Sequence, residues 1–401
     1  MSRIRDVFND KTSYRYFLLS VLITGLSFGL YKGILDNFLA EVVGMGEMDR
    51  GIMEFFRELP GVALVLILAV LYTLSAENLY QAGALIMLIG MLLHYFLPPT
   101  MVLATLAIST YSLGEHIQIG MKNTLSISYS NENRGGEALG IQSSVNQIGS
   151  LAAFVVISVI FLVCPSDGLY YKIFLVSAAL AAVSLILSMK MKGNSETDKN
   201  RRRFYFRKKY KKYYMLEVFY GSRKQVFLTF GPYVLILFYG ASTSTISLLF
   251  AISAVACFFC APLVGRIIDR FGYKIVMISD TLILVIVCFF YGFAHHLFPM
   301  KTAFIVCCVN YVLDSVISLA SMASNLYVKD LSDNEDEMKA TISTGVSVNH
   351  IITVFIALFG GWVWKTLGIE TLFMVSAFLG LCNSAYAATI KTSGKAPDPG
   401  R

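Results

Sequence analysis

Long apolar runs, broken by short polar segments, extend over nearly the whole chain. A helix of about 20 apolar residues crosses a bilayer, and each run is long enough to do so. The pattern predicts helices over residues 15–39, 51–74, 78–97, 101–128, 138–163, 170–190, 216–240, 243–265, 274–294, 302–327, 339–364 and 369–390. We therefore expect an all-α integral membrane protein with twelve transmembrane helices in two groups of six.

One long polar segment, Ser188 to Tyr214, separates the two groups. Eleven Lys and Arg residues lie between Lys190 and Lys212, and so dense a positive run stays on the cytoplasmic side of a membrane. With six helices on either side of it, both termini are expected in the cytoplasm. The predicted divisions are a cytoplasmic N-terminus (1–14), an N-terminal bundle (15–189), a basic linker (190–214), a C-terminal bundle (215–391) and a cytoplasmic tail (392–401).

The second part of this linker mixes Phe and Tyr with Arg and Lys, which is typical of a segment that lies against anionic lipid headgroups. We expect residues 201–214 to make this contact. A flexible linker that holds its side of the protein in the cytoplasm explains the same residues. Single-stranded nucleic acid also binds such segments, but no nucleic acid partner is expected for a run held between membrane helices.

The composition agrees with a membrane protein, because 56% of the 401 residues are hydrophobic and 15% are charged. The net charge of +7 comes mostly from the linker and reports membrane orientation rather than an acidic partner. The seven cysteines lie almost all in apolar runs, where they behave as small hydrophobic residues. Cys257 and Cys260 form a C-x-x-C pair without a second ligand pair, so we expect no metal, cofactor or disulfide framework.

The two halves of the chain also resemble each other weakly. Val145-Asn146-Gln147-Ile148 and Val348-Asn349-His350-Ile351 occupy the same place in the fifth and the eleventh predicted helices. A tetrapeptide rich in Asn and acidic residues precedes each of these helices. Six-helix halves related in this way are one of the standard ways to build a transporter that rocks around a central site.

A loop motif lies between the eighth and ninth predicted helices and reads G-R-I-I-D-R-F-G-Y-K. It closely resembles the G-x-x-x-D-R-x-G-x-K/R loop of the major facilitator superfamily, and the twelve helices with a basic central linker resemble that family's architecture. The matching positions are Gly265, Asp269, Arg270, Gly272 and Lys274. The resemblance implies a monomeric secondary transporter of a bacterial inner membrane that works by alternating access.

The resemblance also implies a gating role for this loop. Gly265 is expected to let two helices approach, Gly272 to permit a tight turn, and Arg270 and Lys274 to anchor the loop at the headgroups. Asp269 is expected to accept hydrogen bonds at a neighbouring helix N-terminus and so act as a latch. The family pattern usually recurs between the second and third helices, but this chain lacks the Asp-Arg-x-Gly core there.

Charged residues inside the apolar runs are functional candidates, because each needs a partner or a wet cavity. The N-terminal half holds most of those that the pattern singles out. Lys32 and Asp36 are spaced i,i+4 beside a Gly-x-x-x-Gly face of the first helix, and the second helix carries Glu54, Arg57 and Glu58 on one stripe. These five charges either clamp the two helices together or handle substrate or protons.

Glu115 and His116 lie near the middle of the fourth predicted helix, and Asp314 has roughly the equivalent place in the tenth. Adjacent positions of a helix differ by about 100°, so Glu115 and His116 cannot both face one partner. Glu115 and Asp314 are candidates for coupling or substrate contact, with structural pairing as the alternative. Further polar candidates for a wet cavity are Asn146, Gln147, Asn310, Asn349 and His350.

These patterns favour a proton-coupled secondary active transporter that moves a small polar or charged solute. A lipid, amphiphile or drug exporter with the same fold is an alternative, as is a non-transporting sensor or scaffold. An intramembrane enzyme that uses Glu115 and His116 lacks a nucleophile or metal partner at recognisable spacing, so no enzymatic activity is expected. The fold by itself identifies no substrate.

Overall fold

The computed structural model describes residues 6–9, 13–71, 74–132, 134–191 and 206–390. Most of the basic linker (192–205), the predicted tail (392–401) and parts of the predicted N-terminus (1–5 and 10–12) therefore lie outside the described residues. The described chain is helical, and its one β-bridge joins Phe8 to Ser130.

The helices before the linker agree closely with the predicted ones. In chain order they are α2 (Ser13–Asn37), the π-helix η1 (Phe38–Val42), α3 (Glu47–Val70), α4 (Ala76–Phe96), α5 (Met101–Ser128), α6 (Gly135–Val163) and α7 (Asp167–Ser188). Those after the linker are the 3₁₀-helix η2 (Lys208–Tyr210), α8 (Lys211–Leu237), α9 (Thr243–Phe271), α10 (Tyr273–Leu297), α11 (Met300–Ile317), the 3₁₀-helix η3 (Ser318–Ser321), α12 (Met322–Leu331) and α13 (Glu335–Ala388).

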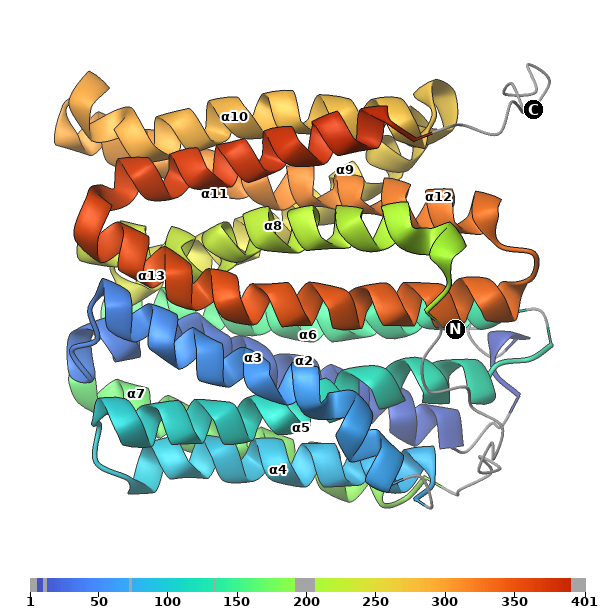
Figure 1. Cartoon of the computed structure of the whole chain (residues 1–401). Helices are drawn as coiled ribbons and strands as arrows, with labels where there is room; N and C mark the ends of the chain where they lie inside the picture. The colour runs from blue at the N-terminus through green and yellow to red at the C-terminus, as the bar shows by residue number, and fades with distance from the viewer. Residues whose placement is uncertain (1–5, 10–12, 72–73, 133, 192–205, 391–401) are drawn as a thin grey trace. The chain divides into compact units, whose positions relative to one another are not determined.

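Two of these elements need to be counted with care. Gly368 (φ 88°) interrupts α13, and Figure 1 shows the chain turning back there, so α13 is two rods. The segments α11, η3 and α12 follow one another without a break and make one rod of 32 residues. Counted so, the described residues hold twelve rods, consistent with the prediction. Among the described residues, eight helices, with α13 counted as one, are long and apolar enough to cross a membrane. The helices α3, α5 and α8 are not among them, and they carry much of the polar chemistry below.

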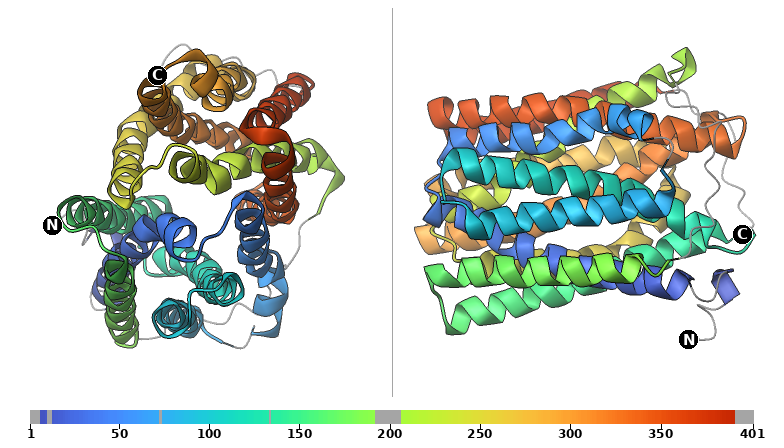
Figure 2. Two further views of the ribbon diagram at one scale, coloured as in Figure 1. Left: turned by 90° about the vertical axis from the view of Figure 1, so that its left-hand side faces the viewer. Right: turned by 90° about the horizontal axis from the view of Figure 1, so that it is seen from below.

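The chain divides into two compact units. Unit 1 comprises Met1–Met45, Phe56–Arg201 and Ser242–Ala251, and unit 2 comprises Gly46–Phe55, Arg202–Ala241 and Ile252–Arg401. In unit 1, α2 packs against α6 and α7, and α4 packs against α5 and α7; Figure 2 shows α4 and α5 nearly end on, side by side. In unit 2, α8 packs against α13, and α10 packs against α11 and α13. The two units thus repeat one packing pattern.

Two glycines show how closely the repeated pairs approach. A Cβ atom on Gly25 of α2 would collide with the carbonyl oxygen of Asn146 on α6. A Cβ atom on Gly221 of α8 would lie 2.7 Å from the side-chain nitrogen of Asn349 on α13. Asn146 and Asn349 are the residues that the sequence repeat aligns. Small residues therefore let each pair of helices touch backbone to backbone or backbone to amide.

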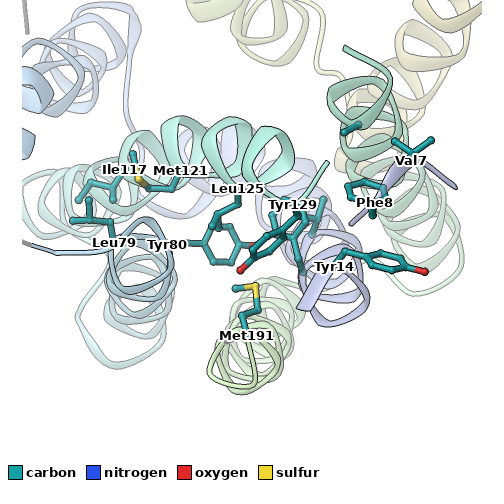
Figure 3. Close-up of a cluster of buried hydrophobic side chains, with 13 residues drawn as sticks. Val7, Phe8, Tyr14, Leu79, Tyr80, Ile117, Met121, Leu125, Tyr129 and Met191 are labelled. Carbon is teal, nitrogen blue, oxygen red and sulfur yellow. The ribbon is translucent and has the colours of Figure 1, made fainter. Parts of the chain in front are cut away.

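The core of unit 1 is rich in aromatic side chains. Figure 3 shows Tyr80 and Tyr129 lying between Leu125 and Met191. The short segment 6–9 joins this cluster, because the backbone N–H of Asn9 donates to the carbonyl of Tyr129 at 2.8 Å. This part of the N-terminus is thereby fixed to the loop between α5 and α6.

One end of unit 2 is held by basic side chains. Lys209 Nζ lies 2.9 Å from Asp333 Oδ2 and 2.8 Å from Glu337 Oε1, and the hydrogen bond to Glu337 raises the pKa of Lys209. Lys212 donates to the carbonyl of Thr389, at the C-terminal end of α13. A positive charge there interacts favourably with the negative end of the helix dipole. These residues were expected against lipid headgroups, but the structure gives them partners within the protein.

The aromatic residues of the same segment also depart from that expectation. Tyr210, Tyr213 and Tyr214 are buried in the core of unit 2. A phenol ring that packs against apolar neighbours loses more water-exposed area than one that lies on a headgroup surface, so burial is favoured. The part of the predicted lipid-binding segment before residue 206 lies outside the described residues.

Candidate functional site

Within unit 1, the first helix carries a partly buried ion pair. Lys32 Nζ lies 2.7 Å from Asp36 Oδ2, and Asp36 is 1% exposed. The i,i+4 spacing brings the two side chains together on one face of α2. The ammonium group of Lys32 also lies 5.4 Å from the ring centroid of Phe250, which is in the first part of α9 and belongs to the same unit. The pair is thus partly buried, because Asp36 is shielded from water while the Lys32 side chain is 28% exposed.

The charged residues of α3 form ion pairs along the helix. Arg57 pairs with Glu58 in unit 1. In unit 2, Arg50 Nη1 lies 2.7 Å from Glu54 Oε2, and Gln225 of α8 donates to Glu54 Oε1 at 2.9 Å. The sequence analysis had missed Arg50, whose side chain is 3% exposed, although its i,i+4 spacing from Glu54 was a usable signal.

Glu115 and His116 on α5 lie in different surroundings, as their adjacent positions predict. Nδ1 of His116 is 2.8 Å from the carbonyl oxygen of Ser112, which requires the proton on Nδ1 and turns the ring back along its own helix. Glu115 is half-buried, and no described residue forms a hydrogen bond or ion pair with its carboxylate. Glu115 therefore remains available for a proton or a solute.

The two polar candidates of α6, Asn146 and Gln147, lie in different surroundings and do not share one cavity wall. Asn146 accepts a hydrogen bond from Lys122 Nζ at 3.4 Å, so α5 contributes a cation that the sequence analysis did not single out. Gln147 is exposed, and its side chain has no hydrogen bond within the described part of the chain. Lys122 lies seven positions after Glu115, on the same face of α5.

Unit 2 contains a second buried ion pair, which the sequence analysis also missed. Arg223 Nη2 of α8 lies 2.8 Å from Asp280 Oδ2 of α10, and the two side chains are 2% and 8% exposed. Both residues stand inside predicted apolar helices, so the rule that intramembrane charges are functional candidates would have found them. Buried charges are therefore as much a feature of the C-terminal half as of the N-terminal half.

A small cavity lies beside this pair. Its volume is about 20 Å³, which is enough for a water molecule. Among the residues that line it are Glu217, Tyr220, Asp280, Ser324 and Asn383. Glu217 accepts a hydrogen bond from Ser324 Oγ at 3.0 Å, whereas the buried Oδ1 of Asn383 has no partner among the described residues. A polar cavity of this kind can hold water or a small cation.

The 3₁₀-helix η3 forms one wall of this cavity. It interrupts the regular hydrogen bonding between α11 and α12, as short 3₁₀ segments do. The hydroxyl of Tyr220 donates to the carbonyl oxygen of Ser318 at 3.0 Å and so ties α8 to η3. The rod thus changes from α-helix to 3₁₀-helix beside the polar cavity.

Asp314 lies on α11, one turn before η3. Its side chain is 8% exposed, and no described residue gives it a hydrogen bond or an ion pair. Its neighbour Asn310 donates instead to the carbonyl of Val306 on the same helix, at 2.8 Å. On α13, Asn349 Nδ2 lies 3.4 Å from Glu217 Oε2, and His350 is half-buried. Asp314 is thus a buried carboxylate without a fixed partner.

The loop motif between α9 and α10 makes a tight turn and contacts the end of α13. Gly272 has φ 81° at the start of α10, which is the expected tight turn. Lys274 donates to the carbonyl of Ile390 at 2.8 Å and so joins the loop to the end of α13. A Cβ atom on Gly265 would meet nothing within 4 Å, so the expected helix approach is not seen. Asp269 and Arg270 are exposed, and the Asp269 carboxylate has no described partner.

The sequence of the C-terminal half matches a family model. Residues 217–400 match the model described as Major Facilitator Superfamily. The match covers somewhat less than half of the chain, so it is the C-terminal half that is similar to the Major Facilitator Superfamily. No curated protein matches the chain by sequence.

Solved structures of transporters share the fold of this protein over nearly the whole chain. A nucleoside transporter, NupG, gives a TM-score of 0.74 at 15% identity and covers 95% of this chain and 100% of its own. A POT family transporter in complex with 5-aminolevulinic acid gives a TM-score of 0.71 at 12% identity, covering 92% of this chain and 94% of its own. At these identities the likeness shows the fold.

Proposed function

We propose that the chain is a member of the Major Facilitator Superfamily and a secondary active transporter that moves a small polar solute by alternating access, coupled to protons. The observation that carries the proposal is the state of Asp314, a buried carboxylate without a partner on a membrane-spanning rod. Burying such a group is costly unless it binds a proton, a cation or a polar solute. A binding event there can therefore favour one conformation over another.

The remaining buried charges support the same proposal. Lys32 with Asp36, and Arg223 with Asp280, are ion pairs already matched in charge. Glu115 and Asp314, one in each unit, are not matched. Structural pairs hold helices together, whereas unmatched carboxylates give a solute or a proton something to bind. This distinction favours transport over a purely structural use of the charges.

The solute class follows from the same side chains. Carboxylates, amides and hydroxyls bind solutes through hydrogen bonds, so a small polar molecule fits better than a lipid. The proteins with the same fold include a nucleoside transporter and a transporter bound to 5-aminolevulinic acid. Nucleosides and amino acids are therefore the first solutes to test.

The experiment is uptake into proteoliposomes that contain the purified chain. Labelled nucleosides, amino acids and 5-aminolevulinic acid are offered with and without an imposed pH gradient. We expect one class to accumulate when the gradient is present and to stop when an uncoupler removes it. Asp314→Asn is expected to lose accumulation while it keeps exchange, because the amide cannot carry a proton.

A matched control is Glu137→Gln, which changes an exposed carboxylate in the first turn of α6. It is expected to accumulate solute at the parental rate. If no solute is taken up and none raises the melting temperature of the purified protein, the transporter proposal fails. A chain with this behaviour is better described as a sensor or scaffold.

A further inference from the structure

Three side chains with metal-ligand chemistry converge at one end of unit 2. His295 and His296 lie in the last turn of α10, and Glu370 lies two residues after the interruption of α13 at Gly368. Nε2 of His295 is 3.1 Å from Glu370 Oε1, and Nε2 of His296 is 2.8 Å from the same oxygen. One ligand atom from each residue lies within 4.8 Å of the other two.

We propose that His295, His296 and Glu370 form a zinc-binding site. Two histidines and one glutamate, with water in the fourth position, are a known ligand set for Zn²⁺. Ligand atoms about 2.1 Å from a tetrahedral ion are separated by about 3.4 Å. The observed separations from Glu370 Oε1 are a few tenths of an ångström shorter, so modest rotation of the side chains admits the ion.

The backbone around the three ligands is arranged to bring them together. The positive φ of Gly368 (88°) turns the chain so that Glu370 faces the end of α10. On α10, a Cβ atom at Gly292 would lie 3.2 Å from the Cα atom of Glu370, so the glycine permits this close approach. The ring of Phe238 packs against His295 with centroids 4.8 Å apart and restricts its orientation.

Access and affinity can be inferred from the surroundings. The His296 side chain is 58% exposed and that of Glu370 is 29% exposed, so an ion can enter from water. Buried Nδ1 of His295 has no hydrogen-bond partner among the described residues. Partners of this second nitrogen usually strengthen metal binding 10- to 100-fold, so we expect reversible binding rather than a permanently occupied structural site.

Bound zinc would join the end of α10 to the second rod of α13. Without the ion, the same groups are linked by hydrogen bonds from the imidazole nitrogens to the carboxylate. Binding replaces these bonds with three metal bonds and fixes the positions of the two helix ends relative to each other. No sequence pattern indicates this zinc site, because adjacent histidines and a glutamate 74 residues later match no zinc spacing.

The test is metal titration of the purified full-length chain after treatment with a chelator. We expect one equivalent of Zn²⁺ to bind by calorimetry, and Co²⁺ to give the visible absorption of a tetrahedral site. His296→Gln and Glu370→Gln are each expected to weaken binding at least tenfold. His296 is exposed, so its variant should keep the parental melting temperature in the absence of metal.

Glu137→Gln is the matched control for Glu370→Gln, since it removes an exposed carboxylate of α6 that belongs to neither group of possible metal ligands among the described residues. It should bind Zn²⁺ with parental stoichiometry and affinity. The proposal is overturned if the parent binds no zinc, or if His296→Gln and Glu370→Gln bind it as well as the parent. Binding is measured directly, so the result does not depend on whether the chain transports a solute.

Discussion

Glu115 and His116 show how one helix can give two neighbouring side chains different roles. His116 uses its Nδ1 proton on a carbonyl of its own helix, which fixes the ring. Glu115 has no partner among the described residues. A residue without a fixed partner can change its interactions as the surroundings change, whereas a residue with one resists such change. We therefore propose Glu115 as the candidate for proton coupling in unit 1.

Glu115→Gln is expected to abolish accumulation driven by a pH gradient while solute binding and exchange persist. The amide has nearly the same shape as the protonated acid but cannot release a proton. The measurement is labelled-solute uptake into proteoliposomes with a gradient, compared with exchange at equal pH on both sides. Glu137→Gln again serves as the control.

Accumulation by Glu115→Gln at the parental level would assign Glu115 a structural role. Asp314 would then be the remaining unpaired carboxylate for coupling. Loss of both accumulation and exchange would instead indicate that Glu115 contacts the solute.

Ion pairs between residues close together on one helix could be predicted from the sequence. Lys32 and Asp36 are joined as their i,i+4 spacing indicates. Arg223 and Asp280 are 57 positions apart, so no local pattern pairs them. The lack of a partner for Asp314 is also a property of the folded structure, because it depends on what every neighbouring helix presents.

The contact between α2 and α6 decides how closely two helices of unit 1 approach. Gly25 lies against the backbone of Asn146, and Gly29 of the same stripe would place a Cβ atom 2.6 Å from the carbonyl oxygen of Ser150. Backbone atoms cannot move aside as a flexible side chain can. Any added side chain must push the helices apart.

Gly25→Ala is therefore expected to destabilise the protein by about 1–3 kcal/mol, the usual cost of overpacking. The measurement is the thermal unfolding midpoint of the purified protein in detergent. Gly120→Ala is the matched control, because a Cβ atom there meets nothing within 4 Å and alanine favours a helix. An equal or higher midpoint for Gly25→Ala would show that the two helices can separate at no cost.

Most helix boundaries could be predicted from the sequence, because apolar length and polar breaks define them. The α5 boundaries, 101–128, agree with the prediction at both ends. The π-helix η1 and the 3₁₀-helix η3 could not be predicted in this way. Each makes a hydrogen bond with a distant element that no local pattern indicates, such as the bond from Tyr170 to Glu41 Oε2 at 2.6 Å in η1.

Over the whole molecule, the basic residues determine the expected orientation in the membrane. In unit 2 the end where α8 and α10 begin and α13 finishes carries Lys209, Lys212 and Lys274. The linker adds further positive charge next to this end in the sequence. Positive charge near short loops stays in the cytoplasm, so this end is expected there.

Reporter fusions can test this orientation. Reporters at Asp198 and at the C-terminus are both expected to read cytoplasmic, and a reporter at Pro99, in the connection between α4 and α5, is expected to read the opposite side. A periplasmic signal at Asp198 or at the C-terminus would contradict the number of crossings.

The interruption at η3 also bears on how force travels along the tenth crossing. A continuous α-helix is stiff, so a push at one end moves the other end by the same amount. Between α11 and α12, the Tyr220 hydroxyl of α8 donates a hydrogen bond to the backbone of η3 and holds this point of the rod against α8. We therefore expect the rod to bend at η3, so that the half that carries Asp314 tilts relative to the half beside the basic end of unit 2.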